Sequence, residues 1–521
     1  MSLTEDTNGS PGHPPAEPAS RAPEQPASPG DTPPAAPPPV SPPPVSPPPV
    51  ASAAGIGSSE AGSSEAGSSE AGSSRARSTM RAEWAEAGIW LLLVAFGLVG
   101  TAVLARSHVA LGLREPPWHD GWQARFDALI VVPVTVAAII LAVVGRWASA
   151  SSGTVAVFRL PWPLVLVMGY AGSLLWTLAL ALITPGGVRA GLRAPTDLVT
   201  AAAAIGRNPL DMVAAYTDRV PPATAGSVDV LPAHPPGPLL AAWALARLGL
   251  SGAVPLGIAF TLVGALTVPV VCVAVRSLCH ETAARRLVPI LVLAPWSGWM
   301  TASPDAVTAL LAALAVAVGV VGCEPGRRDR TWWALASGVL LGLAALFGYA
   351  PVWLGVAVAA AYFVRRRPLL NAVTGLGALL PLFLFAAWGF SWPDGLALAR
   401  VPHRPLTATL AWVFLDLTVA LLGAGPVAVR AARRLRHTPG WPFLVGAAAT
   451  ALFAALARLA EGGTQRTWLP LFPWLLVAAV APHPRPAAPG DRVRAGTLPV
   501  ILISLGAAGA ITLRLFMAGP S

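Results

Sequence analysis

The chain contains about thirteen long apolar runs, and this repetition constrains its fold more than any other feature. Most runs hold about 18 to 24 residues, the helix length that crosses a hydrocarbon core of roughly 30 Å. Only 12% of the residues are charged, against roughly 25% in soluble domains. We therefore predict an all-α polytopic membrane protein. The runs are 87–105, 127–145, 160–183, 254–275, 287–301, 305–322, 331–347, 350–364, 369–390, 407–424, 440–457, 467–481 and 497–517.

Arginine placement predicts the orientation of these spans. The formal charge of +10 is carried by Arg alone, because the sequence contains no Lys. If the N-terminal tail is cytoplasmic, every second loop faces the cytoplasm, and each of these loops is basic, as at 365–367. We assign the charge to topology and expect no nucleic-acid binding. The alternation requires that 238–250 lies at the outer interface, since it is too short to span.

The first 80 residues differ in composition from the rest. They contain PPPVSPPPVSPPPV and then GSSEAGSSEAGSSEAGSS. The first repeat favours polyproline II and the second a flexible coil, and neither can bury a core. We divide the chain into a disordered cytoplasmic tail, 1–80, and a polytopic membrane domain, 81–521. The PxxP repeats permit partner binding, and an extension without a fixed role is the alternative.

A long polar loop, 184–253, interrupts the apolar pattern on the predicted outer side. Long loops inside compact domains are uncommon and tend to be functional. Within it, 209–216 has apolar residues at helical spacing, which is typical of an amphipathic helix on a membrane surface. The loop also supplies candidate carboxylates: Asp197, Asp211 and Asp218.

The motif His234-Pro235-Pro236-Gly237 lies near the end of this loop. The prolines fix the backbone ahead of the next helix, and the His234 imidazole is expected at the outer water boundary. A helix N-terminus there offers unpaired N–H groups that favour phosphate. The alternative is a rigid loop end without chemistry.

Two further candidates fall on the same predicted face. Asp305, in Ser303-Pro304-Asp305, opens a span, where the alternative role is an ordinary helix N-cap. Arg466 lies at the outer mouth of a late span, and Arg suits bidentate phosphate binding. Its alternative role is that of an interface anchor. The shared face favours one site built from His234, Asp305 and Arg466.

Three segments of this sequence resemble segments of a known protein family. "HPPGPLLAAW", "SPDAV" and "QRTWLPLFPW" resemble segments of actinobacterial integral membrane proteins related to the GT-C glycosyltransferases, which include the protein O-mannosyltransferase and aminoarabinose-transferase-like families. The resemblance covers roughly 160–480. It implies a GT-C-like bundle, a polyprenyl-phosphate-linked sugar donor and a catalytic carboxylate in the first large outer loop.

The resemblance implies sugar transfer to a cell-envelope acceptor at the outer membrane face. Asp197 first, and Asp211 or Asp218 second, would accept the proton of the acceptor hydroxyl. His234 and Arg466 would stabilise the leaving phosphate. Asp305 would orient a loop residue or a divalent metal. The transferred sugar is mannose or arabinose in this interpretation.

The sequence also departs from the family pattern. Members usually carry an acid soon after the span that precedes the loop, whereas Thr184 to Arg189 contains none. A catalytically silent scaffold of the same fold is therefore an alternative. A lipid or sugar transporter is another, although Asp416 is the one carboxylate inside an apolar run and no internal repeat is visible.

Overall fold

The computed structural model describes residues 63–107, 109, 111, 128–149, 160–192, 198–223, 230–401, 405–459, 461, 463–480 and 498–516. Every regular element in these ranges is an α-helix or a 3-10 helix, and they contain no strand. The predicted all-α class is confirmed. Of the predicted disordered tail, 1–80, residues 1–62 lie outside the described residues, and 63–80 belong to a helix.

Within the described residues, eight helical segments are long and apolar enough to cross a membrane, by length and composition. Three shorter apolar helical segments accompany them: 351–364, 441–456 and 500–516. The chain is thus a multi-pass membrane protein. The long helices are α1 (Ser63–Arg106), α2 (Val131–Ser149), α3 (Trp162–Leu182), α9 with α10 (Ala253–Ala265 and Thr267–Leu278), α12 (Pro304–Gly322), α13 (Arg330–Phe347), α15 (Leu370–Ala387) and α17 (Leu406–Ala424).

The two remaining predicted runs are broken by proline. The run 287–301 forms the end of α11 (Glu281–Leu293) and a 3-10 helix, η5 (Pro295–Met300). The run 467–481 forms only single turns, including α21 (Phe472–Leu475). Proline lacks the N–H that continues a helix. Both broken segments are almost entirely buried, so they pack inside the bundle.

Helix α1 begins earlier than the sequence pattern suggested, at Ser63. The end of the second tail repeat and the residues that follow it, up to the predicted boundary at residue 80, are therefore part of this helix. Once a helix has a stable nucleus, each further residue adds a hydrogen bond at little cost. The apolar run 87–105 supplies that nucleus.

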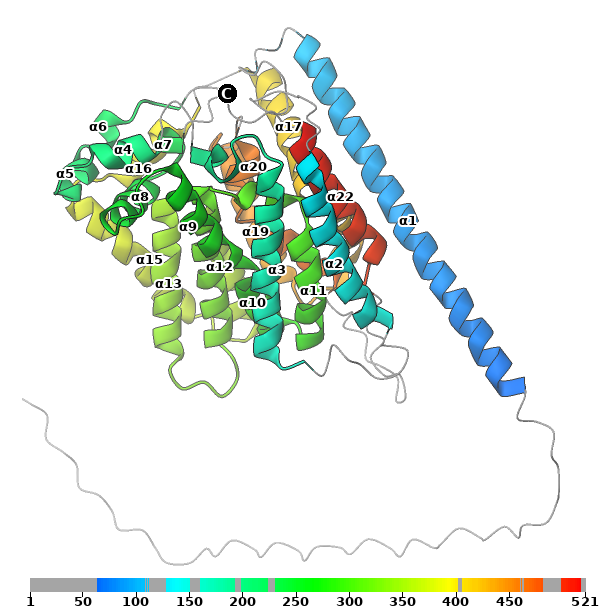
Figure 1. The fold of residues 1–521 in the computed structure, drawn as a ribbon. Coiled ribbons are helices and arrows are strands. Elements are labelled where there is room, and N and C mark those ends of the chain that lie inside the picture. Colours follow the sequence, from blue (N-terminus) through cyan, green and yellow to red (C-terminus); the bar gives the residue numbers. More distant parts are fainter. Residues whose placement is uncertain are drawn as a thin grey trace, which may run out of the picture. The chain divides into compact units, whose positions relative to one another are not determined.

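Short helices gather at one end of the bundle (Figure 1). Among them is α8 (Gly237–Arg247), whose 11 residues extend about 16 Å. The predicted segment near 238–250 is thus a helix too short to span a membrane, and its place at the outer interface remains a prediction. The predicted amphipathic helix at 209–216 is divided at Ala215 into α5 and α6. The other helices of this end are α4 (Leu198–Ala204), α5 (Pro209–Ala214), α6 (Tyr216–Arg219), α7 (Val230–Ala233) and α16 (Trp392–Ala399).

Glycine allows α13 and α15 to touch backbone to backbone. A Cβ on Gly338 would lie 2.1 Å from the Thr374 carbonyl oxygen, and one on Gly342 would lie 2.3 Å from that of Ala378. Gly338 and Gly342 form a GxxxG pair, which is how membrane helices approach closely without a hydrophobic driving force. This contact supports α13, on whose end the HPPG motif rests.

A buried ion cluster fastens α1 to the bundle. Arg430 of α18 (Val427–Arg434) lies 2.7 Å from a carboxylate oxygen of Glu86 and 3.7 Å from one of Glu83. Glu83 also accepts a 3.1 Å hydrogen bond from the backbone N–H of Ile501, at the start of α22 (Val500–Phe516). All three side chains of the cluster are buried, so each charge depends on the others.

An arginine also ties helix ends together at the end of the bundle opposite His234. Arg365 donates to the carbonyl oxygens of Val320, at 2.7 Å, and Ser277, at 2.5 Å. These carbonyls lie in the last turns of α12 and α10, where no helical N–H reaches them. The basic loop at 365–367 therefore caps the ends of two helices.

Cysteine labelling would test the orientation. The 19 residues of α12 extend about 28 Å, so its two ends face opposite sides of a membrane. We expect Gly206→Cys, in open space between α4 and α5, to react with an impermeant maleimide on intact cells. Arg328→Cys, exposed beyond α12, should react only after the membrane is opened. The three native cysteines are buried, and the reverse pattern would overturn the orientation.

Candidate functional site

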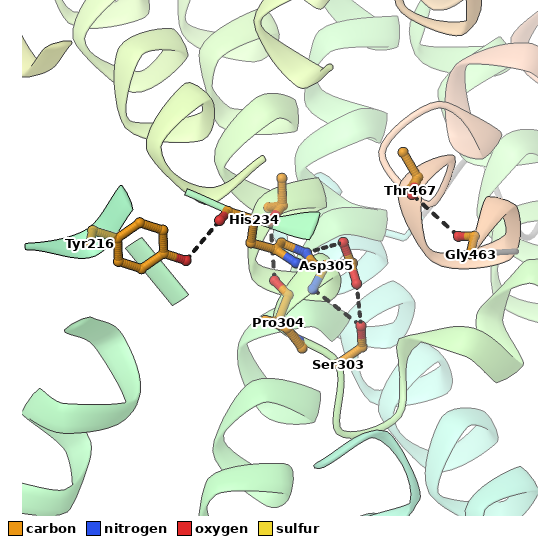
Figure 2. A network of polar contacts seen from close by, with 8 residues as sticks. Tyr216, His234, Ser303, Pro304, Asp305, Gly463 and Thr467 are labelled. Atoms are coloured by element: carbon orange, nitrogen blue, oxygen red, sulfur yellow. Dashed lines mark hydrogen bonds and ion pairs between the residues drawn. The ribbon is translucent and has the colours of Figure 1, made fainter. Parts of the chain in front are cut away.

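His234 and Asp305 form a buried pair. The His234 Nε2 atom lies 2.8 Å from Asp305 Oδ1, and the two residues are 8% and 5% exposed. His234 comes from the turn between α7 and α8, and Asp305 from the first turn of α12 (Figure 2). The two residues, which the sequence analysis placed on one face, are thus in direct contact.

Ser303 holds the second oxygen of the Asp305 carboxylate. Its hydroxyl donates to Asp305 Oδ2 at 3.0 Å and accepts from the Asp305 backbone N–H at 3.1 Å. Ser303 is thus the N-cap of α12, and Asp305 is also part of a polar site. Ala302 precedes them with a φ of 54°, a left-handed conformation that is uncommon outside glycine. This sharp turn directs both side chains toward the HPPG loop.

Arg466 is the third residue of the predicted site. It lies on the single-turn helix α20 (Thr464–Thr467), and its guanidinium is close enough to interact electrostatically with the Asp305 carboxylate. It also interacts with Arg514 of α22. Two guanidiniums and one carboxylate leave a net positive charge, which favours an anionic ligand.

Arg514 was not singled out by the sequence analysis. Its half-buried side chain donates a hydrogen bond to the Gly298 carbonyl of η5. The available signal was an Arg inside the last apolar run, since ionisable residues in spans usually mark functional or paired positions.

The other sequence-predicted acids do not join this group. Asp211 is exposed at the start of α5, where its carboxylate accepts from the Asn208 side chain at 2.8 Å. Asp218 is exposed on α6. Asp197 lies outside the described residues. The described chain therefore brings together His234, Asp305 and Arg466, and leaves Asp211 and Asp218 apart from them.

The glycine of the HPPG motif is required by packing. A Cβ on Gly237 would lie 2.3 Å from the Leu346 carbonyl oxygen, near the end of α13. The start of α8 therefore rests directly on the backbone of α13. This contact sets the position of the HPPG motif, and so of His234, relative to α13.

The described residues contain no group of three or more His, Cys, Asp or Glu side chains that could hold a metal ion. His234 and Asp305 would supply two protein ligands, and Arg466 beside them adds positive charge. Because the described donor set does not fit a metal centre, we derive no step through a metal.

A known family model matches the segment that contains His234 and Asp305. Residues 233–391 match the model of the family described as dolichyl-phosphate-mannose-protein mannosyltransferase. The match begins one residue before His234 and includes Asp305, whereas Arg466 lies beyond it. The resemblance to glycosyltransferases is thereby confirmed for this segment. No curated protein matches the chain.

Solved structures that are similar to this chain include that of ArnT from Cupriavidus metallidurans, bound to undecaprenyl phosphate. It is 16% identical, with a TM-score of 0.42, over 68% of this chain and 76% of that one. The oligosaccharyltransferase of Archaeoglobus fulgidus, in complex with zinc and sulfate, is 14% identical, with a TM-score of 0.36, over 68% of this chain and 54% of that one. At these scores, nothing about substrate follows from the likeness.

Proposed function

We propose that this protein is a membrane glycosyltransferase of the GT-C class. It transfers a sugar, mannose or arabinose, from a polyprenyl-phosphate donor to a cell-envelope acceptor at the outer face of the cell membrane. The observation that carries the proposal is the buried His234–Asp305 pair beside Arg466. A lipid phosphate needs a cationic partner at the membrane boundary, and these residues supply it.

The proposed reaction inverts the anomeric centre. The acceptor hydroxyl oxygen attacks the anomeric carbon, and the bond from that carbon to the phosphate oxygen breaks. The electron pair leaves with the phosphate, whose growing charge Arg466 and His234 stabilise. The hydroxyl proton passes to a loop carboxylate. Asp197 is our choice for this base, because Asp211 and Asp218 are exposed and lie apart from the pair.

The proposal predicts sugar transfer by the full chain in lipid vesicles. We expect radiolabelled polyprenyl-phosphate mannose or arabinose to lose its label to an envelope acceptor. Arg466→Gln should slow this transfer about 10- to 100-fold, because a charged partner of the leaving phosphate is lost. The matched control is Arg400→Gln, an exposed arginine after α16, which should keep the wild-type rate. Equal losses in both variants would contradict the assignment.

A catalytically silent scaffold is the second candidate function. It is favoured by the position of Asp211 and Asp218, which are exposed and apart from the pair. Such a protein would bind polyprenyl phosphate without transferring sugar from either donor. The same vesicles therefore decide between the candidates, provided that lipid binding is measured beside transfer.

A further inference from the structure

The HPPG segment leaves two backbone carbonyls without their usual helical donors. In an α-helix the carbonyl of residue i accepts from the N–H of residue i+4. For Leu231 that residue is Pro235, and for His234 it is Pro238. Proline has no N–H. The prolines that stiffen the motif therefore also remove the donors that would hold its backbone.

The hydroxyl of Tyr216 stands in for these missing donors. It lies 3.0 Å from the Leu231 carbonyl oxygen and 2.8 Å from that of His234. Figure 2 shows the ring pointing from its own helix, α6, toward His234. The single O–H of Tyr216 is thus shared between the two carbonyls, and the Leu231 carbonyl also accepts from the His234 backbone N–H at 3.3 Å.

Packing fixes the position of this phenol. Tyr216 is 2% exposed, and its ring meets Phe390 edge-on, with centroids 5.7 Å apart and planes at 88°. Burial raises the pKa of Tyr216 well above its usual value, so the hydroxyl remains a proton donor at every physiological pH. The Tyr216 hydroxyl therefore stays protonated and is held in position by packing.

We infer that Tyr216 is a positioning residue for His234. This inference rests on the proposed function, in which His234 acts on the leaving phosphate. The Tyr216 hydroxyl holds the backbone carbonyl of His234, while Asp305 holds its imidazole. With both ends fixed, the ring keeps one orientation. Without the hydroxyl, the His234 carbonyl loses the 2.8 Å hydrogen bond that holds this end of the residue, and the segment is free to shift.

The first test is a double-mutant cycle on sugar transfer. Tyr216→Phe keeps the ring and its contact with Phe390, and removes only the hydroxyl. We expect kcat to fall about tenfold, with a KM for the lipid-linked donor within about twofold of wild type. In a His234→Ala background the same change should have no further effect. A full tenfold loss in that background would overturn the inference.

The second test does not need activity. Nitrogen-15 histidine spectra of the full chain in nanodiscs would report the His234 ring, assigned by its loss in His234→Ala. We expect Tyr216→Phe to move this signal. Tyr362→Phe is the matched control, because it removes a buried hydroxyl that bonds Thr374 at 3.2 Å in another part of the bundle. The control should leave the signal in place.

The two tests separate the possible failures. If the wild-type chain transfers no sugar but Tyr216→Phe still moves the His234 signal, the proposed function fails and the positioning role stands. If transfer occurs and neither kcat nor the signal responds to Tyr216→Phe, the positioning role fails and the function stands.

Discussion

Asp305→Asn is expected to reduce sugar transfer about 100-fold or more. The substitution keeps the size of the side chain and removes the charge that pairs with His234 and interacts with Arg466. A buried pair that loses one charged member leaves the other uncompensated, and the tautomer and orientation of the imidazole are no longer fixed. Initial rates with a polyprenyl-phosphate sugar in vesicles would measure the loss.

The chain supplies a close control for this experiment. Asp394 also follows a Ser N-cap and a Pro in the first turn of a helix, α16, and it is exposed. Asp394→Asn should therefore transfer sugar at the wild-type rate. Thermal unfolding of each variant in detergent would show whether the chain remains folded. A folded Asp305→Asn protein with full activity would remove Asp305 from the mechanism.

The Gly338→Val substitution is expected to destabilise the bundle by about 3 kcal/mol or more. The first carbon of the new side chain would fall 2.1 Å from the Thr374 carbonyl oxygen. Backbone cannot yield as a flexible side chain can, so α13 and α15 must separate along their shared face. The free energy of unfolding in mixed micelles would measure this cost.

Gly375→Val on α15 is the matched control for this contact. It lies on the same helix pair, but a Cβ there meets nothing within 4 Å. We expect stability within about 0.5 kcal/mol of wild type. If both variants unfold equally easily, the loss reflects helix propensity and the close contact between α13 and α15 has no special role.

The sequence predicted a shared face for the residues that come from short motifs. His234 and Asp305 lie 71 residues apart, and each lies near the start of a helix on the same predicted face, but their hydrogen bond becomes visible only in the structure. The broken runs at 287–301 and 467–481 were harder, because their composition is that of a span. Only the proline positions distinguish them from one.

Tyr216 and Arg514 could not be predicted in the same way. Each acts on a backbone carbonyl, and every residue type offers the same carbonyl. Arg514 reaches a carbonyl 216 residues away, and Tyr216 contacts a motif whose need for a donor becomes visible only when its prolines are counted against helical spacing. The sequence therefore marks an Arg inside an apolar run and a proline-rich motif, but it does not show which residue each of them contacts.

The ion cluster on α1 has a consequence for how the protein is made. Glu86 is translated 344 residues before the arginine that neutralises it. At roughly 5 to 20 residues per second, that delay is about 17 to 70 s. A buried carboxylate without its cationic partner is costly, so α1 cannot take its packed position when it leaves the ribosome. The helix that is synthesised first therefore docks on the bundle only after α18 has been made.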